Sequence, residues 1–306
     1  MKKKYILFFT AVFGYVTAFI VSFATLTHFF QTPKPTGFIQ NFVTTVNPYK
    51  RNPLSALITF NTTQPATVTL HIQGRDGATD IVHTFSTPTT KHFIPVLGLY
   101  PDYNNHVSLT INFINGTKKT KKVDILAEKI SKAALINILR KEDNKAKYYF
   151  LYDGLVFDEQ GWIRLSFNAN DGLLYWMGNE FISESRIGGL TRYSMLGKEL
   201  KHYDYPKGFI SFTHDIGQKP NGNFLVIGSF ADTTALINGK EEKTHRDFVI
   251  ELDYHTGEMV NKIDLAEILN PNRSVIIPAD QKDYGANDWC HINAVDYDSS
   301  DKSIIV

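Results

Sequence analysis

Hydrophobic positions along the chain fall into many short runs rather than long amphipathic stretches. Between residues 41 and 125 such runs alternate with clusters of turn-forming residues; they are "LSALITF", "ATVTLHI", "DIVHTFS", "KHFIPVLGL", "HVSLTINFI" and "KKTKKVDIL". Short alternating runs separated by turn clusters every ~8–12 residues are typical of antiparallel strands. The pattern predicts a β-sandwich domain over residues 41–125.

A second rhythm occupies residues 147–306. Apolar runs there flank tight turns rich in Asp, Asn and Gly, in "LVFDEQGWIRLSF", "FNANDGLLYWM", "TRYSMLGKELKHY", "KPNGNFLVIGS", "VIELDYHTGEMVNKIDL" and "AVDYDSSDKSIIV". Each predicts a β-hairpin. Hairpins with weak self-similarity every ~40–50 residues are typical of propeller blades, and a generic antiparallel sandwich is the alternative. The predicted fold class is all-β, with residues 126–146 as a short helical or irregular connector.

The N-terminus carries a topological signal. Lys2, Lys3 and Lys4 precede an apolar run over residues 5–30. This run exceeds the ~7–15 apolar residues of a cleavable signal peptide and matches the ~20 that span a bilayer. We expect residues 1–30 to be a transmembrane signal anchor, with a long signal peptide as the alternative, followed by a linker over residues 31–40. The positive residues stay inside, which places the rest of the chain outside the cytoplasm, in the periplasm or at the cell surface.

Composition excludes several classes of protein. Lys and Arg number 32 against 31 Asp and Glu, so no charge excess favours nucleic acid as a partner. The single cysteine, Cys290, excludes an intrachain disulfide, and it reads either as a small apolar filler or as a nucleophile. Neither H-E-x-x-H, G-x-S-x-G nor a phosphate-loop motif occurs, so we expect no metal and no cofactor.

Two histidine-containing phrases carry a family resemblance. They are "GFISFTHDIGQKPNGNFLVIGS" at residues 208–229 and "DWCHINAVDYDSSDKSIIV" at residues 288–306, supported by "NPYKRNPLSALITF" and "IPVLGLYPDYNNHVSLTI". Together they resemble the bacterial aryl-sulfate sulfotransferases. The resemblance implies a small N-terminal β-domain joined to a six-bladed propeller, with the active site at the central channel. It also implies sulfuryl transfer from a phenolic sulfate donor to a phenol acceptor through a sulfohistidine, without a nucleotide donor, and a possible homodimer.

The same resemblance assigns site roles to His214, His291 and Asn293, as acid, base and anion-binding groups. On residue type alone, a histidine that caps a loop by hydrogen bonding is the favoured interpretation of His214. His291 and Asn293 stand at i and i+2, so an extended strand would point both to one face together with Trp289, either into a channel or to solvent on an edge strand. The neighbouring "HRD" at residues 245–247 reads as a polar turn.

Residues 147–306 supply strands for about three blades, half of the six that the resemblance implies. The family's sulfuryl-binding arginine and its covalent histidine would both follow Val306. We therefore expect this chain to be truncated, and inactive when made alone. A non-catalytic extracytoplasmic propeller that binds a ligand or partner is the alternative function.

Overall fold

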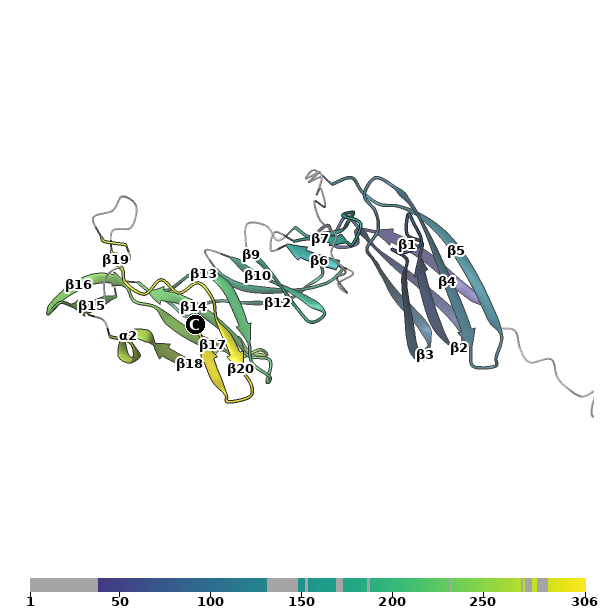
Figure 1. Ribbon diagram of the computed structural model, residues 1–306. Helices are drawn as coiled ribbons and strands as arrows, with labels where there is room; N and C mark the ends of the chain where they lie inside the picture. Colours follow the sequence, from purple (N-terminus) through teal and green to yellow (C-terminus); the bar gives the residue numbers. More distant parts are fainter. Residues whose placement is uncertain are drawn as a thin grey trace, which may run out of the picture.

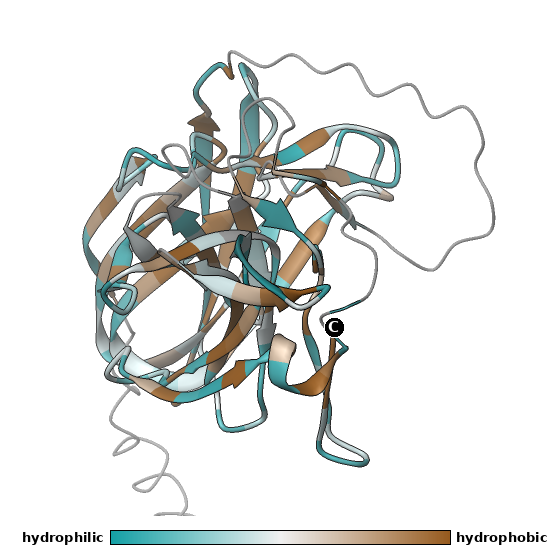
Figure 2. Ribbon diagram, turned by 90° about the vertical axis from the view of Figure 1, so that its left-hand side faces the viewer, coloured by the Kyte–Doolittle hydropathy of each residue, from teal (hydrophilic) through white to brown (hydrophobic). Residues whose placement is uncertain are grey.

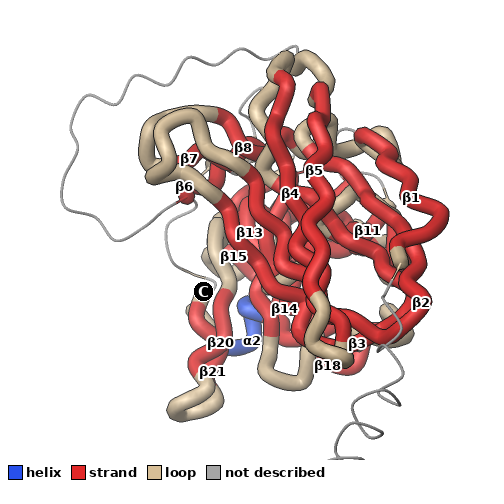
Figure 3. Tube along the Cα trace, turned by 90° about the vertical axis from the view of Figure 1, so that its right-hand side faces the viewer, coloured by secondary structure: helices blue, strands red, loops and turns tan. Residues whose placement is uncertain are grey.

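The computed structural model describes residues 38–130, 148–151, 154–168, 173–185, 188–231, 233–270, 272, 277–279 and 286–306, without the side chains of residues 173, 185 and 212–214. Most of these residues are in strands joined by turns and loops, with one short helix, α2 (Leu265–Ile268), shown in blue in Figure 3. The predicted all-β class is confirmed. The apolar run at residues 5–30 and most of the predicted connector lie outside the described residues. Within the described part, no helix has the length and apolarity to cross a membrane.

The first five strands form one antiparallel sheet at one end of the molecule (Figure 1). Its strands are β1 (Ile39–Val46), β2 (Ser55–Ile72), β3 (Ile81–Leu97), β4 (Asn104–Phe113) and β5 (Lys118–Leu126). Strand β2 pairs with β3 along one edge, and on its other edge it pairs first with β1 and then with β4. Strand β5 completes the sheet beside β4.

Strands β2 and β3 each join two of the runs that the sequence separates. The clusters at residues 62–65 and 87–90, predicted as turns, lie inside these strands, so that part of the prediction is wrong. The register is interrupted between Asn61 and Ala66, which accommodates Pro65 without a ladder N–H. The Thr62 hydroxyl donates to the Gln64 carbonyl at 2.7 Å, so a side chain supplies a local partner and the strand continues.

Alternation along β2 buries every second side chain in a core that extends beyond the first sheet. Ile58 and Val68 are fully buried on β2, and Leu155, Phe157 and Ile163 from the following strands pack in the same cluster. Full burial of such a side chain contributes about 1.5–3 kcal/mol. The first sheet and the strands that follow it are therefore held together by shared apolar packing. Figure 2 shows apolar and polar residues alternating along many strands.

A buried arginine reinforces this junction. Arg164 is 1% exposed, and its guanidinium pairs with Asp158 at 3.0 Å. It also donates to the Gly98 carbonyl at 2.8 Å, to the Tyr100 hydroxyl at 2.9 Å and to the Thr79 carbonyl at 3.2 Å. Because Gly98, Tyr100 and Thr79 belong to the first sheet and its loops, this side chain couples the two parts of the chain.

Four further antiparallel sheets follow in chain order (Figure 1). Their strands are β6 (Tyr148–Leu151), β7 (Leu155–Asp158) and β8 (Ile163–Ser166); β9 (Leu173–Met177), β10 (Glu180–Ser185), β11 (Gly189–Ser194) and β12 (Glu199–Tyr203); β13 (Phe209–Gln218), β14 (Phe224–Phe230), β17 (Phe248–Leu252) and β18 (Met259–Asp264); and β20 (Asp296–Asp298) with β21 (Ser303–Ile305). Five predicted hairpins are confirmed by direct pairing: β7 with β8, β11 with β12, β13 with β14, β17 with β18, and β20 with β21.

The sixth predicted hairpin, "FNANDGLLYWM", is wrong. Strand β8 pairs with β7, whereas β9 pairs with β10, so the segment connects two sheets. The hairpin of this region turns instead at Gly178, whose φ of 60° suits a tight reversal between β9 and β10. The first strands of successive sheets lie together, with β13 in contact with both β9 and β20.

An insertion between β14 and β17 contributes two strands to a separate small sheet. Strands β15 (Thr234–Ile237) and β16 (Lys240–His245) form a hairpin, and β19 (Asn287–Asp288) pairs in parallel with β16. Asn238 and Gly239 close the hairpin with φ values of 50° and 76°, as a type I′ turn requires. The pairing sets His245 of β16 beside Asp288 of β19, and it fixes where the chain enters the segment that carries His291.

Candidate active site

His291 lies in a loop and not on a strand. Residues 291–295 have no strand hydrogen bonding, and His291 itself has a φ of 56°. The predicted extended geometry, with Trp289, His291 and Asn293 on one face, is therefore wrong. Burial of the preceding apolar residues explains this. Trp289 is 0% exposed and Cys290 6% exposed, and both pack in a cluster with Leu265 of α2. A left-handed turn then lets the chain leave that core with His291 and Asn293 exposed.

Two buried carboxyl groups hold His291 in this position. The imidazole Nδ1 forms a short hydrogen bond with the Asp288 carboxylate, and the backbone N–H donates to Asp247 Oδ2 at 2.9 Å. Asp247 and Asp288 are 1% and 6% exposed, while the His291 side chain is 40% exposed. Burial, and next the charge of Asp288, raise the pKa of Asp247 to about 6. Two buried carboxyl groups therefore hold the Nδ1 and the backbone N–H of His291, while part of its side chain stays exposed.

The support of Asp247 is itself built from several elements. Its carbonyl accepts from the backbone N–H of Leu265 at 3.1 Å, at the start of α2. The neighbouring Arg246 binds both carboxylate oxygens of Asp264, the residue that caps α2, at 3.0 Å and 2.6 Å. Residues 245–247, which the sequence suggests are only a polar turn, thus connect β16, β17 and α2 at the base of His291.

His214 lies on β13, within the stretch between Ser211 and Ile216 where the pairing with β14 is interrupted. The described side chains do not include His214. The carboxylate of its neighbour Asp215 accepts from two backbone N–H groups, that of Ile216 at 2.9 Å and that of Val295 at 3.2 Å. The strand bearing His214 is therefore linked to the loop bearing His291 and Asn293, immediately before β20.

A further buried carboxyl group, that of Glu184, lies next to β13. Glu184 of β10 is 5% exposed and accepts from the Tyr205 hydroxyl at 2.7 Å and from the Ser211 hydroxyl. Burial raises the pKa of Glu184 to about 7, against the opposing effect of these two donors. Burial, together with Glu184 and Asp215, also raises the pKa of Tyr175 on β9. Ser211 is three residues before His214, so this cluster supports the irregular part of β13.

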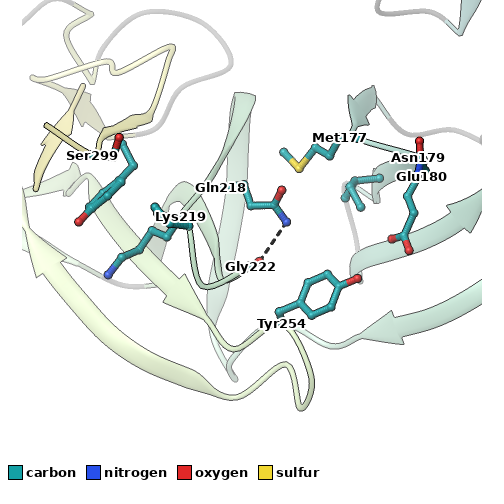
Figure 4. A pocket seen from close by; sticks show the side chains of 12 residues that line it. Met177, Asn179, Glu180, Gln218, Lys219, Gly222, Tyr254 and Ser299 are labelled. Carbon is teal, nitrogen blue, oxygen red and sulfur yellow. Dashed lines mark hydrogen bonds between the residues drawn. The ribbon is translucent and has the colours of Figure 1, made fainter.

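A hollow of about 590 Å³ opens at the ends of β9, β13 and β20, where each of these strands turns into its hairpin (Figure 4). Its rim carries two ion pairs, Lys219 with Glu251 at 3.0 Å and Arg192 with Glu180 at 2.7 Å. Tyr254 also lines it. His291 and Asn293 do not line this hollow, although the two phrases that contain the predicted histidines contribute Gln218, Lys219, Tyr297 and Ser299 to its lining. Among the described residues no cluster of His, Cys, Asp and Glu suits a metal ion.

Of the three aspartates that organise these segments, sequence reasoning missed Asp247 and Asp288, and it gave Asp215, beside His214, only a role in orienting the loop. Two adjoin predicted site residues, as "HD" and "DWCH", and a carboxylate three residues before a histidine was the available signal. Asp247 had no such signal, because the contact with His291 spans 44 residues of sequence. The structure brings the His214 strand close to the loop that carries His291 and Asn293. It does not place Trp289, His291 and Asn293 on one face of a strand, as the sequence predicts.

Comparison with known proteins identifies the family. Residues 114–306 match the arylsulfotransferase family model, and residues 43–128 match the arylsulfotransferase Ig-like domain. The arylsulfate sulfotransferase AssT of Lelliottia amnigena is 24% identical over 378 aligned positions, covering 90% of this chain and 62% of the relative. The AssT of Escherichia coli O6:H1 is 27% identical over 146 residues, covering 37% of this chain and 24% of the relative. The chain thus spans less than two thirds of either relative, and it belongs to the arylsulfotransferase family.

Proposed function

We propose that this protein transfers a sulfuryl group from a phenolic sulfate ester to another phenol. The observation that carries the proposal is the match to the arylsulfotransferase family over residues 114–306, which includes both histidine phrases. Both curated relatives are named arylsulfate sulfotransferases. The exposed imidazole of His291 on a buried carboxylate gives the chain a group suited to proton transfer.

The chemistry accounts for the residue types. In the proposed reaction the S–O bond to the donor phenol breaks and a bond from sulfur to a histidine nitrogen forms. The acceptor phenol oxygen then attacks sulfur, and the S–N bond breaks. The transferring group bears negative charge on three oxygens, much as a phosphoryl group does, so N–H donors such as imidazole and the Asn293 amide stabilise it.

Proton transfer accompanies both halves of this reaction. A phenolate has a conjugate-acid pKa near ~10, so protonation by an imidazolium assists its departure, and the resulting imidazole deprotonates the incoming phenol. We assign this acid and base role to His214 and His291. The histidine that carries the sulfuryl group is assigned to neither of them.

We further propose that the sheets after residue 147 are blades of a propeller. The support is topological, because strands β9 to β12 follow one another across a four-stranded sheet, and the next sheet has the order β13, β14, β17, β18. Their first strands lie side by side with β20. In such an arrangement the first strands line a central channel, which would place the His214 strand at the channel wall.

The proposal includes an extracytoplasmic location with membrane attachment through residues 5–30, on the strength of the apolar run and its preceding lysines. A homodimer is part of the same proposal. Fractionation of cells that express the protein with a reporter after residue 306 tests the location. We expect the reporter to be absent from the soluble cytoplasmic fraction.

Sulfuryl exchange is the test of the function. The protein is incubated with 4-nitrophenyl sulfate and phenol, and both 4-nitrophenolate and phenyl sulfate are measured. We expect stoichiometric exchange, and a loss of about 10²-fold or more in His214→Ala and in His291→Ala. His106→Ala, in an exposed pair with Asp124 on the first sheet, is the matched control. Saturable binding of 4-nitrophenyl sulfate without any turnover would instead favour a non-catalytic binding protein.

A further inference from the structure

The proposal above does not define what the second carboxylate beside His291, that of Asp288, does in the reaction. Asp288 Oδ2 meets Nδ1 of His291, and the two residues are three positions apart in sequence. Asp288 belongs to β19, where its backbone pairs in both directions with Ile277, at 2.9 Å and 3.1 Å, and where it lies in register with His245 of β16. Its carboxylate is therefore held by a fixed strand while the histidine ring reaches solvent.

We infer that Asp288 is a positioning residue that holds His291 as the Nδ1–H tautomer, so that Nε2 is the atom that exchanges a proton with the phenol oxygen. This inference rests on the proposed function for the identity of the phenol, although the tautomer itself does not. A carboxylate accepts hydrogen bonds and donates none when ionised, so the proton of a neutral imidazole must lie on the nitrogen that faces it.

The backbone at His291 supports the same conclusion. At a φ of 56°, His291 lies in the left-handed region, which costs a non-glycine residue free energy relative to the right-handed region. Asp247 offsets part of this cost by accepting the His291 N–H at 2.9 Å from a position that is 1% exposed. Strained conformations held by surrounding groups recur at functional sites. Here the turn leaves the His291 side chain 40% exposed, while Trp289 and Cys290 stay buried.

The proton balance of the step follows from this geometry. When the acceptor phenol attacks, its O–H proton moves to Nε2 of His291 and the ring becomes an imidazolium with both nitrogens protonated. The negative charge of Asp288 stabilises that cation, and the same proton returns from Nε2 to a departing phenolate. Asp288 neither gains nor loses a proton in this cycle, and it acts only through His291. This division of roles matches that of a carboxylate behind a catalytic histidine.

The experiment reads the tautomer directly. The protein is labelled with ¹⁵N-histidine, and the signals of His291 are assigned by comparison with His291→Gln. The ring nitrogens are then observed at a pH at which the ring is neutral. We expect a protonated Nδ1 and an unprotonated Nε2. A protonated Nε2 in the wild-type protein overturns the inference, and this measurement needs no variant of Asp288.

A pair of variants then connects the tautomer to turnover. In Asp288→Asn the amide can donate to Nδ1, so we expect the Nε2–H tautomer and a fall in kcat of about 10²–10⁴-fold, with the donor KM changed far less. Asp124→Asn makes the same change beside His106, where Nδ1 also meets a carboxylate at 2.7 Å, and we expect no change in kcat.

The outcomes separate the inference from the proposed function. A wild-type protein with the Nδ1–H tautomer but no sulfuryl exchange overturns the function and retains the positioning of His291. An Asp288→Asn protein that keeps its near-ultraviolet circular dichroism and its kcat within about 3-fold overturns the positioning role, whatever the wild-type rate.

Discussion

Glu184 makes the stability of the protein depend on pH in a direction opposite to that of an ordinary salt-bridged carboxylate. Its side chain is 5% exposed between β10 and β13, and its pKa is raised from 4.5 to about 7 by burial. The folded state therefore binds the proton more tightly than the unfolded state. Stability from this group is fully present below the unfolded pKa and is lost as the pH rises through about 7.

The size of the effect follows from that difference. Each pKa unit corresponds to 1.36 kcal/mol, so the difference sets a ceiling of about 3 kcal/mol. Between about pH 5 and about pH 8 the two titration curves give a loss of about 2.5 kcal/mol. The Glu184→Gln side chain does not ionise, and it keeps an oxygen that accepts from the Tyr205 and Ser211 hydroxyls. The variant therefore removes the pH-dependent stability of Glu184 with little change of shape.

The assay is urea denaturation of wild type and Glu184→Gln at a series of pH values. We expect the difference in free energy of unfolding, variant minus wild type, to rise by about 2.5 kcal/mol between about pH 5 and about pH 8. Asp247, whose pKa is raised to about 6, contributes to both proteins and cancels in the difference. Glu199→Gln, at an exposed position of β12, reports the loss of charge alone. Parallel pH profiles for wild type and Glu184→Gln would refute the reasoning.

Two further predictions concern stability. Arg164→Met leaves Asp158 buried without its counter-ion, and we expect a loss of about 3–5 kcal/mol in urea denaturation, against no more than about 0.5 kcal/mol for Lys198→Met at an exposed turn; similar values for both would show that the pair does not couple the two parts of the chain. Gly189→Ala sets a Cβ 1.9 Å from the Tyr203 carbonyl oxygen at a φ of 121°, whereas Gly116→Ala at a φ of 86° meets open space. We expect Gly116→Ala to cost about 1–2 kcal/mol in thermal denaturation and Gly189→Ala clearly more, and equal melting temperatures would contradict this steric argument.

Much of the fold follows from local pattern, because hairpins are local structures. The turns at Gly161, Gly197, Gly222 and Gly257 each have a positive φ, and each lies where alternating runs reverse. The pattern failed where pairing is not local. "FNANDGLLYWM" has a turn composition, yet β8 pairs with β7 and β9 pairs with β10, so the two strands belong to different sheets.

The long strands β2 and β3 show a second limit of sequence reasoning. Proline and threonine clusters normally end strands. Here they coincide with a shared irregularity, where the Thr62 hydroxyl lies 3.0 Å from His92 Nε2 on the opposite strand. That compensation involves residues 30 positions apart, so neither cluster reveals it separately.

For the candidate site, the sequence names residues, whose roles stay a prediction, but not their geometry. His291 and Asn293 emerge from their phrase, yet their i, i+2 spacing wrongly implied an extended strand. The burial of Trp289 and Cys290 overrides the alternation, and the turn at His291 depends on Asp247 from a distant segment. The contact with Asp288 was within reach of sequence reasoning, because it spans three residues.

We propose that this family member moves a sulfuryl group between phenols, with His291 as a proton-transfer group. The most direct measurement is the rate of phenyl sulfate formation from 4-nitrophenyl sulfate and phenol by the protein, in wild type, His291→Ala and His106→Ala. The account predicts that wild type and His106→Ala form phenyl sulfate at equal rates, and that His291→Ala is slower by about 10²-fold or more. An undiminished rate in His291→Ala, or no phenyl sulfate from the wild-type protein, would contradict it.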